Sequence, residues 1–169
     1  GLWKIPFGIR DPRTSVNRVS QFLIGKLFAC NIDDSKPIQL LRISSIAPCG
    51  MDCALCYAFQ DVKKPCPGCR TQTGKIRESC QNCIIFSCDK KKYYCFECTN
   101  FPCKRLKALD ARYQNKYKMS MIMNLTFIKE QGEENFLIWQ NHKYTCPKCG
   151  KLRTVHYDYC IHCKQQKLT

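Results

Sequence analysis

The sequence predicts a small α+β fold that bound metal ions stabilise in place of a large apolar core. The first observation is composition, because 16 of the 169 residues are cysteine. The second is spacing, because six Cys-x-x-Cys pairs occur: 53/56, 66/69, 80/83, 95/98, 146/149 and 160/163. Two thiolates three residues apart can bind one tetrahedral ion in a tight turn, whereas the disulfide frameworks of secreted proteins rarely repeat that pair. We therefore expect free, metal-binding thiols.

Thiols and charge also predict location and partners. Free thiols persist in a reducing compartment, so we expect a cytoplasmic protein. The formal net charge is +15, and fifteen metal-bound thiolates with four divalent ions would bring it to about +8. A basic excess of this size favours RNA, DNA or a nucleic-acid-bound protein as the partner. No stretch reaches the length of a transmembrane helix, so no membrane contact is expected.

Residues 1–45 differ from the rest of the chain and are expected to form an N-terminal extension. The segment is basic at first and then carries an apolar run over residues 22–30 that ends at Cys30. A signal peptide or lipoprotein site would have this general form, but Lys26 interrupts a run that is already short. The alternatives are a short amphipathic helix and a partly disordered leader, with Cys30 outside the metal array.

Residues 46–103 are predicted to form an irregular metal-binding module. Histidine is absent from this segment, so its ligands would be thiolates, with a carboxylate such as Asp52, Asp61 or Glu97 as an occasional substitute. Eleven cysteines allow two four-thiolate sites with three cysteines left over, which would serve an open third site, an iron-sulfur cluster or bridging positions in a shared cluster. Sequence order alone does not group them. The candidate ligands are Cys49, Cys53, Cys56, Cys66, Cys69, Cys80, Cys83, Cys88, Cys95, Cys98 and Cys103.

The order of these cysteines resembles a known family. The pattern is Cys-Gly-x-x-Cys-x-x-Cys from Cys49, then Cys-Pro-Gly-Cys from Cys66, two further Cys-x-x-Cys pairs, and Phe-Pro-Cys at 101–103. Over residues 46–120 it is similar to an uncharacterised prokaryotic family of cysteine-rich proteins, a domain of unknown function. The resemblance implies a small metal-binding domain without an assigned activity. The first three cysteines also match the cluster-binding spacing of radical S-adenosylmethionine enzymes, but the alternating strands and helices of their barrel are missing.

Residues 104–142 are predicted to be a helical segment of three short helices. Thr99 or Asn100 would cap the first helix, with Pro102 in its first turn and Cys103 near its N-terminus. The second helix would begin at Ser120 and end at Gly132, and the third would follow and close near His142. A small bundle is the simpler interpretation, and a DNA-reading helix-turn-helix is the alternative.

Residues 143–169 are predicted to form a zinc ribbon. Two knuckles, separated by ten residues, would present the ligands Cys146, Cys149, Cys160 and Cys163 at the ends of short strands. Glycine directly after the first knuckle would relieve its turn. Four cysteines complete a tetrahedron without histidine, and rubredoxin-type iron could use the same set.

We expect roughly three or four zinc ions in a protein that acts as a binding or adaptor module contacting nucleic acid or a nucleoprotein partner. The alternative is an iron-sulfur protein with a [4Fe-4S] cluster in residues 49–103. Enzyme activity is less expected, because we find no Ser-His-Asp set, no phosphate-binding glycine loop and no catalytic pair of carboxylates in a helical setting. The basic contacts would come from Lys148, Lys151, Arg153, Lys164 and Lys167.

Overall fold

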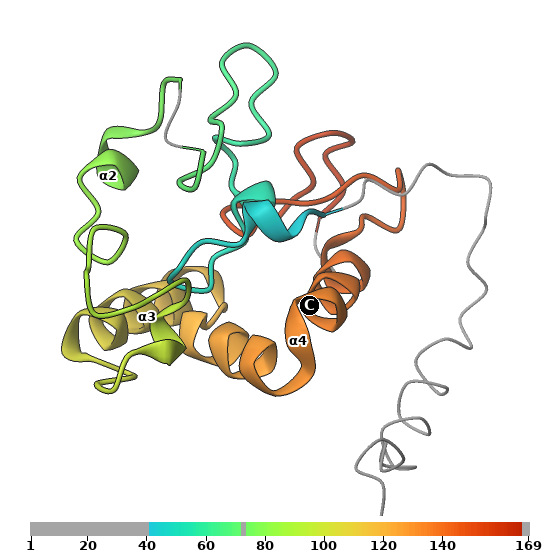
Figure 1. Ribbon diagram of the computed structural model, residues 1–169. Helices are drawn as coiled ribbons and strands as arrows, with labels where there is room; N and C mark the ends of the chain where they lie inside the picture. Colours follow the sequence, from blue (N-terminus) through green and yellow to red (C-terminus); the bar gives the residue numbers. More distant parts are fainter. Residues whose placement is uncertain (1–40, 72–73, 167–169) are drawn as a thin grey trace, which may run out of the picture. The chain divides into compact units, whose positions relative to one another are not determined.

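The computed structural model describes residues 41–71 and 74–166, which belong to the compact unit Pro37–Thr169 (Figure 1). The leader interpretation of residues 1–40 and the role of Cys30 lie outside the described residues. Leu41 and Ser45 are buried, so the last residues of the predicted extension contribute to the fold. The boundary at residue 45 stays a prediction.

Helical segments supply the regular structure. The short ones are the 3-10 helices η1 (Ile43–Ser45), η2 (Cys53–Leu55) and η3 (Cys95–Glu97) and the single-turn α2 (Glu78–Gln81). The long ones are α3 (Lys104–Tyr117) and α4 (Met121–Tyr144). Between residues 46 and 103 the chain runs mostly as turns and loops around the cysteines (Figure 1).

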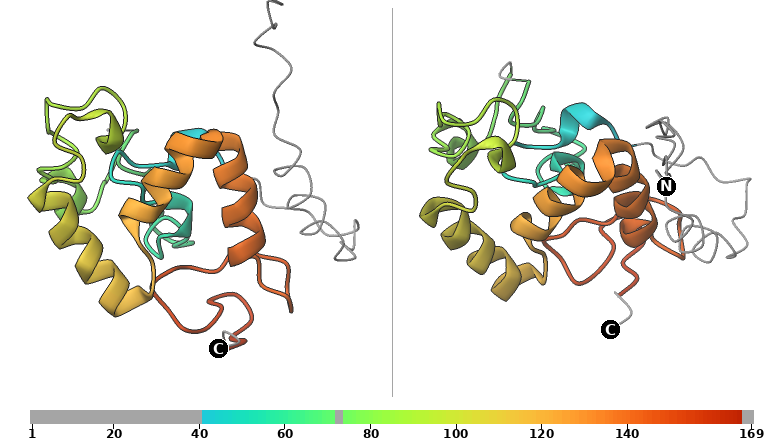
Figure 2. Two further views of the ribbon diagram at one scale, coloured as in Figure 1. Left: turned by 90° about the horizontal axis from the view of Figure 1, so that it is seen from below. Right: turned by 60° about the horizontal axis from the view of Figure 1, so that its bottom comes forward.

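The predicted second and third helices are the two halves of α4. Ser120 caps the element by accepting a hydrogen bond from the Met123 N–H at 3.0 Å. Gly132 interrupts it with φ 82° and ψ 166°, a conformation that glycine alone adopts readily. Figure 2 shows the halves of α4 turning back beside each other, and Phe127 stacks on Trp139 across the bend at 5.2 Å. The predicted helix start and break are confirmed.

The first helix begins later than predicted. Its N-cap is Cys103, so Thr99, Asn100 and Pro102 all precede it. The reason is that the preceding cysteine turn continues through these residues, with the Phe101 N–H donating to the Cys98 carbonyl at 3.0 Å. The predicted position of Cys103 at a helix N-terminus is confirmed.

One apolar core draws on all three described segments. Ile46 and Leu55 from the cysteine module, and Phe136 from the helical segment, are almost completely buried, together with Leu152 and Val155 from the C-terminal piece. The Val155 N–H also donates to the Leu55 carbonyl at 3.0 Å. The C-terminal piece is thereby fixed to the cysteine module by backbone as well as by side chains.

The β component of the predicted α+β fold is small. In residues 41–71 and 74–166 it consists of isolated bridges that join Ile46 to Asp52, Thr145 to Leu152 and Tyr159 to Gln166. A small, mostly helical fold with a cysteine cluster is therefore observed, and the α+β assignment stays a prediction.

Candidate metal centre

The four C-terminal cysteines meet in one cluster. The sulfur atoms of Cys146, Cys149, Cys160 and Cys163 all lie within 4.8 Å of one another. The Cys146 and Cys163 sulfurs are 3.6 Å apart, and those of Cys149 and Cys160 are 3.7 Å apart. A tetrahedral zinc site with Zn–S bonds of about 2.3 Å requires sulfur–sulfur distances of about 3.8 Å. The cluster has the size that a metal ion needs.

The two halves of this cluster are built alike. In the first, the Gly150 N–H donates to the Cys146 carbonyl at 2.8 Å, and the Cys146 N–H donates to the Lys151 carbonyl at 2.9 Å. In the second, the Lys164 N–H donates to the Cys160 carbonyl at 2.8 Å, and the Cys160 N–H donates to the Gln165 carbonyl across the turn. Gly150 has φ 70° and Lys164 has φ 61°. Each turn therefore needs a left-handed residue directly after its second cysteine, and only the first uses glycine.

The backbone prepares one thiol of this cluster for metal binding. Burial raises the pKa of Cys146, but hydrogen bonds from the N–H groups of Cys149 and Lys148 and with the thiols of Cys163 and Cys149 together lower it to about 7. Burial and the neighbouring sulfurs raise the pKa of Cys149 to about 12. Metal ligands must be deprotonated, so a cation that binds here would displace the protons of these thiols.

In the cysteine module, the pairs 53/56 and 66/69 approach each other. The Cys53 and Cys69 sulfurs are 3.4 Å apart, and this contact, followed by burial, raises the pKa of Cys53. Burial also raises the pKa of Cys56, against the lowering effect of two backbone N–H groups that point at its sulfur and with a further contribution from Cys66. Two predicted pairs therefore come together here.

A second meeting point joins one pair to two single cysteines. Cys95 in η3 and Cys98, the C-cap of η3, line a cavity together with Cys88 and with Cys103 at the start of α3. Burial raises the pKa of Cys95 to about 11; Lys91 lowers it, and the three other thiols of the group raise it. The sequence did not signal this grouping, because Cys88 and Cys103 belong to no Cys-x-x-Cys pair.

Cys49, Cys80 and Cys83 remain between these groups. Burial, with smaller contributions from Cys53, Cys83 and Cys95, raises the pKa of Cys49 to about 12 against the lowering effect of the Met51 N–H. Burial also raises the pKa of Cys80, with contributions from Cys53 and Cys56. Among the described residues, only the C-terminal four have all their ligand atoms within 4.8 Å. The ligand role of the eleven module cysteines stays a prediction.

The three carboxylates considered as substitute ligands accept hydrogen bonds from nearby turns. Asp52 accepts from the Ala54 N–H at 2.9 Å and from the Ser45 hydroxyl at 2.6 Å. Asp61 accepts from the N–H groups of the two lysines that follow it. Glu97 accepts from the N–H groups at the start of η3. Each therefore shapes a turn next to cysteines.

A family model described as "Protein of unknown function (DUF3795)" matches residues 45–108. This agrees with the resemblance to an uncharacterised cysteine-rich family, and it covers the segment with eleven cysteines. No curated protein and no solved structure matches the chain. Within the part of the chain that the structure describes, no helix combines the length and the apolarity needed to cross a bilayer.

Proposed function

We propose that this protein is a zinc-stabilised binding module that contacts nucleic acid, or a nucleic-acid-bound protein, through the basic surface of its C-terminal ribbon. The observation that carries the proposal is the cluster of four sulfurs at tetrahedral spacing between Cys146 and Cys163. Four thiolates fill the tetrahedron of a zinc ion and leave no position for substrate, so the metal would be structural. Function would then reside on the surface that the metal holds in place.

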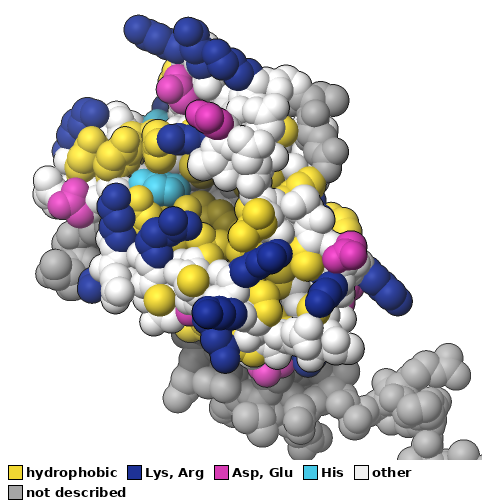
Figure 3. All heavy atoms as spheres, turned by 90° about the vertical axis from the view of Figure 1, so that its left-hand side faces the viewer, with side chains coloured by type: hydrophobic (Ala, Val, Ile, Leu, Met, Phe, Trp, Pro, Cys, Tyr) yellow, Lys and Arg dark blue, Asp and Glu magenta, His cyan; other side chains and the backbone are white. Residues whose placement is uncertain are grey.

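Charge supports this surface role. Lys148, Lys151 and Lys164 are exposed around the cluster, and Arg153 is half-buried beside it. Lys167, the remaining predicted contact, lies outside the described residues. Figure 3 shows a different face, the side on which α2 lies in Figure 1, where lysine and arginine side chains also surround an apolar area. Cations around an apolar surface fit a polymer that has phosphates on one side and bases on the other.

Two tyrosines on the ribbon add a surface for base stacking. Tyr157 and Tyr159 stack with their ring centroids 5.3 Å apart, and Tyr157 is 36% exposed. The Lys164 ammonium lies 5.3 Å from the centre of the Tyr159 ring. Exposed aromatic rings beside cations are the elements that bind single-stranded nucleic acid without strong sequence preference.

The lysine run at residues 90–92 contributes charge without a matching pair of tyrosines. Tyr94 is only 4% exposed and donates its hydroxyl to Glu133 on α4 at 2.6 Å. Tyr93 is exposed but carries the Arg70 guanidinium over its ring at 3.5 Å. The stacking part of the proposal therefore rests on the ribbon.

The test is fluorescence anisotropy with single-stranded RNA, single-stranded DNA and duplex DNA at increasing salt. If the three exposed ribbon lysines each neutralise a duplex phosphate, their contribution to affinity should fall about 40-fold between about 50 and 200 mM salt. A triple Lys→Gln variant at 148, 151 and 164 should reduce the salt slope by roughly 2 to 3. The matched control removes the same charge from the exposed helical lysines 104, 107 and 129. No binding at low salt would refute the proposal.

Metal identity is measured on the same protein, purified without oxygen. Zinc and no colour would agree with the proposal. Iron with sulfide would favour the iron-sulfur alternative, in which residues 49–103 hold a [4Fe-4S] cluster for electron transfer.

A further inference from the structure

A small cavity lies between η3 and the start of α3. Its volume is about 30 Å³, and Cys88, Cys95, Cys98 and Cys103 all line it. The remaining lining includes the apolar side chains of Ile84, Ile85, Phe101 and Leu106. A cavity of about 30 Å³ has room for an ion or for water-sized molecules and is too small for an organic ligand. Water would also find few hydrogen-bond partners among these side chains.

We propose that Cys88, Cys95, Cys98 and Cys103 bind one divalent zinc ion as a closed four-thiolate site. The site would be separate from the C-terminal cluster and independent of nucleic-acid contact. Its function would be to fix the cysteine module to the N-terminus of α3. The four sulfur ligands are of the kind that zinc prefers in structural sites. Among the described residues only the C-terminal four already have their ligand atoms within 4.8 Å of one another, so zinc binding would have to draw these four sulfurs together.

Local structure brings the four side chains to the cavity. The η3 turn is closed by the Cys98 N–H donating to the Cys95 carbonyl at 3.2 Å, which places the first two sulfurs three residues apart in a tight turn. Cys103 is the N-cap of the 14-residue α3, and no side chain caps the N–H groups of its first turn. The positive end of a helix dipole stabilises a thiolate at this position.

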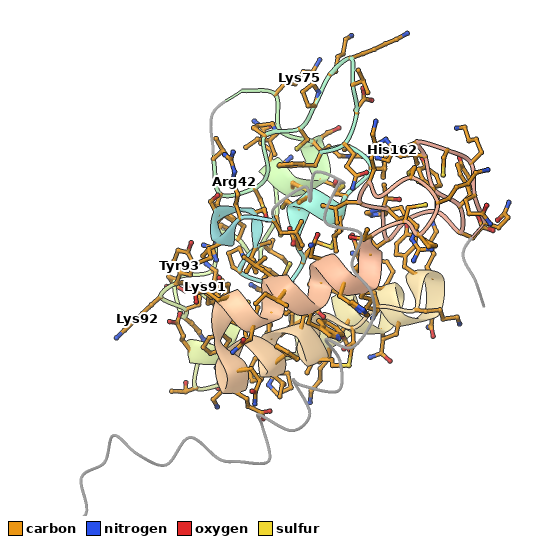
Figure 4. All side chains as sticks on the ribbon, turned by 90° about the vertical axis from the view of Figure 1, so that its right-hand side faces the viewer. Arg42, Lys75, Lys91, Lys92, Tyr93 and His162 are labelled. Carbon is orange, nitrogen blue, oxygen red and sulfur yellow. The ribbon has the colours of Figure 1, made fainter. Side chains whose placement is uncertain are left out.

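Cations offset the charge of the proposed site. Four thiolates around a divalent ion carry a net charge of −2. The Lys91 ammonium donates to the carbonyls of Phe86 at 2.7 Å and Cys88 at 2.9 Å, which holds it in the cavity lining, and Arg105 lines the same cavity. Lys92, by contrast, extends away from the fold (Figure 4).

Consecutive Cys-x-x-Cys pairs need not share an ion in this structure. By analogy with the C-terminal cluster, the pair 80/83 would join the pair 95/98. The structure instead brings Cys80 near Cys53, Cys56 and Cys66, and neither Cys80 nor Cys83 lines the cavity. The two groupings predict different losses of zinc when cysteines are replaced in pairs.

The experiment counts zinc per full-length chain by elemental analysis after zinc loading and removal of free metal. Cys88→Ser and Cys95→Ser should each lose one zinc, and the double variant should lose the same single ion. Cys95→Ser combined with Cys146→Ser should lose two, and so should Cys95→Ser combined with Cys80→Ser if Cys80 binds an ion elsewhere. The proposal is overturned if Cys88→Ser with Cys95→Ser loses two ions, or if Cys88→Ser loses none.

A second measurement avoids variants that fail to fold. Zinc-loaded wild-type protein is treated with a chelator in steps and alkylated with iodoacetamide, and the modified cysteines are mapped by mass spectrometry. Cys88, Cys95, Cys98 and Cys103 should become reactive in the same step. Reaction of Cys88 or Cys103 while Cys95 is still protected would overturn the grouping.

Lys91 offers a functional check with a matched control. Lys91→Gln should weaken zinc affinity at this site about tenfold, because groups next to metal ligands typically affect affinity by that amount or more. Lys92→Gln removes the same charge one residue away and should leave the affinity unchanged; equal effects would refute the role of Lys91. If the module site fails these tests while Cys146→Ser still releases zinc and nucleic-acid binding persists, the proposed function stands without it.

Discussion

Gly50→Ala tests how the cysteine module is fixed to the helices. Gly50 has φ +87°, and a Cβ atom there would lie 2.6 Å from the Met121 carbonyl oxygen and 2.8 Å from the Leu125 Cγ. The Gly50 carbonyl also accepts a hydrogen bond from the buried Asn124 side chain at 2.8 Å. The added methyl group would therefore collide with the first turn of α4, and the backbone oxygen cannot move without displacing that turn.

Two costs add at this position. A left-handed conformation costs about 1–3 kcal/mol in a residue other than glycine, and overpacking a close contact costs about 1–3 kcal/mol more. Gly132→Ala is the matched control, because Gly132 has φ +82° and nothing within 4 Å of the added Cβ. Gly132→Ala should therefore lose only the stability that the left-handed conformation costs. Gly50→Ala should therefore be the less stable variant by about 1–3 kcal/mol.

The measurement is thermal unfolding followed by circular dichroism at a fixed concentration of free zinc, since metal binding itself shifts the midpoint. For a chain of this size, each kcal/mol lowers the midpoint by about 2–4 °C. Zinc content is determined for both variants, so that metal loss at the neighbouring Cys49 is separated from the packing effect. Equal midpoints for the two variants at wild-type zinc content would show that the close approach of Gly50 to α4 is absent in solution.

Four further substitutions test other contacts and turns. Asp110→Asn should lower the free energy of unfolding by about 1–3 kcal/mol at neutral pH. Burial raises the pKa of Asp110, but hydrogen bonds from the start of α4 and from other side chains hold the pKa below 3.8. The contribution of Asp110 to stability is therefore present above that pH and is lost as pH falls through the folded-state pKa. Urea unfolding of both proteins between pH 7 and 3 should show the difference narrowing; a constant difference would contradict this. Lys164→Gly should stabilise the zinc-loaded C-terminal piece by up to about 1 kcal/mol, because it removes a side chain from a left-handed position, and Gly150→Ala should destabilise the same piece. Competition for zinc with a chromophoric chelator measures both effects. Weaker zinc retention by Lys164→Gly would argue against the strained turn. Tyr94→Phe should cost about 1 kcal/mol through loss of the Glu133 hydrogen bond, and unfolding midpoints that match the wild type would show that this bond contributes nothing.

Features that depend on neighbouring residues could be predicted from the sequence. Ser120 and Gly132 marked the ends of a helix correctly, because a cap and a left-handed glycine act within one turn. The start of α3 was wrong by several residues, because Thr99 and Asn100 are good caps locally but the turn after Cys98 already uses that stretch of backbone. At this point the turn that follows Cys98 decides where the helix begins, and local helix-capping propensity does not.

The sequence by itself determined where thiol pairs occur and that the last four cysteines form one cluster, because two pairs in a short segment have few other partners. Only the tertiary structure decided the arrangement within residues 46–103. The meeting of Cys88 and Cys103 with the pair 95/98, the approach of Gly50 to α4 and the position of Lys91 depend on the path of the chain between them. Eleven chemically identical thiols give no local signal of which path is taken, so their grouping follows from how the intervening loops pack against the helices.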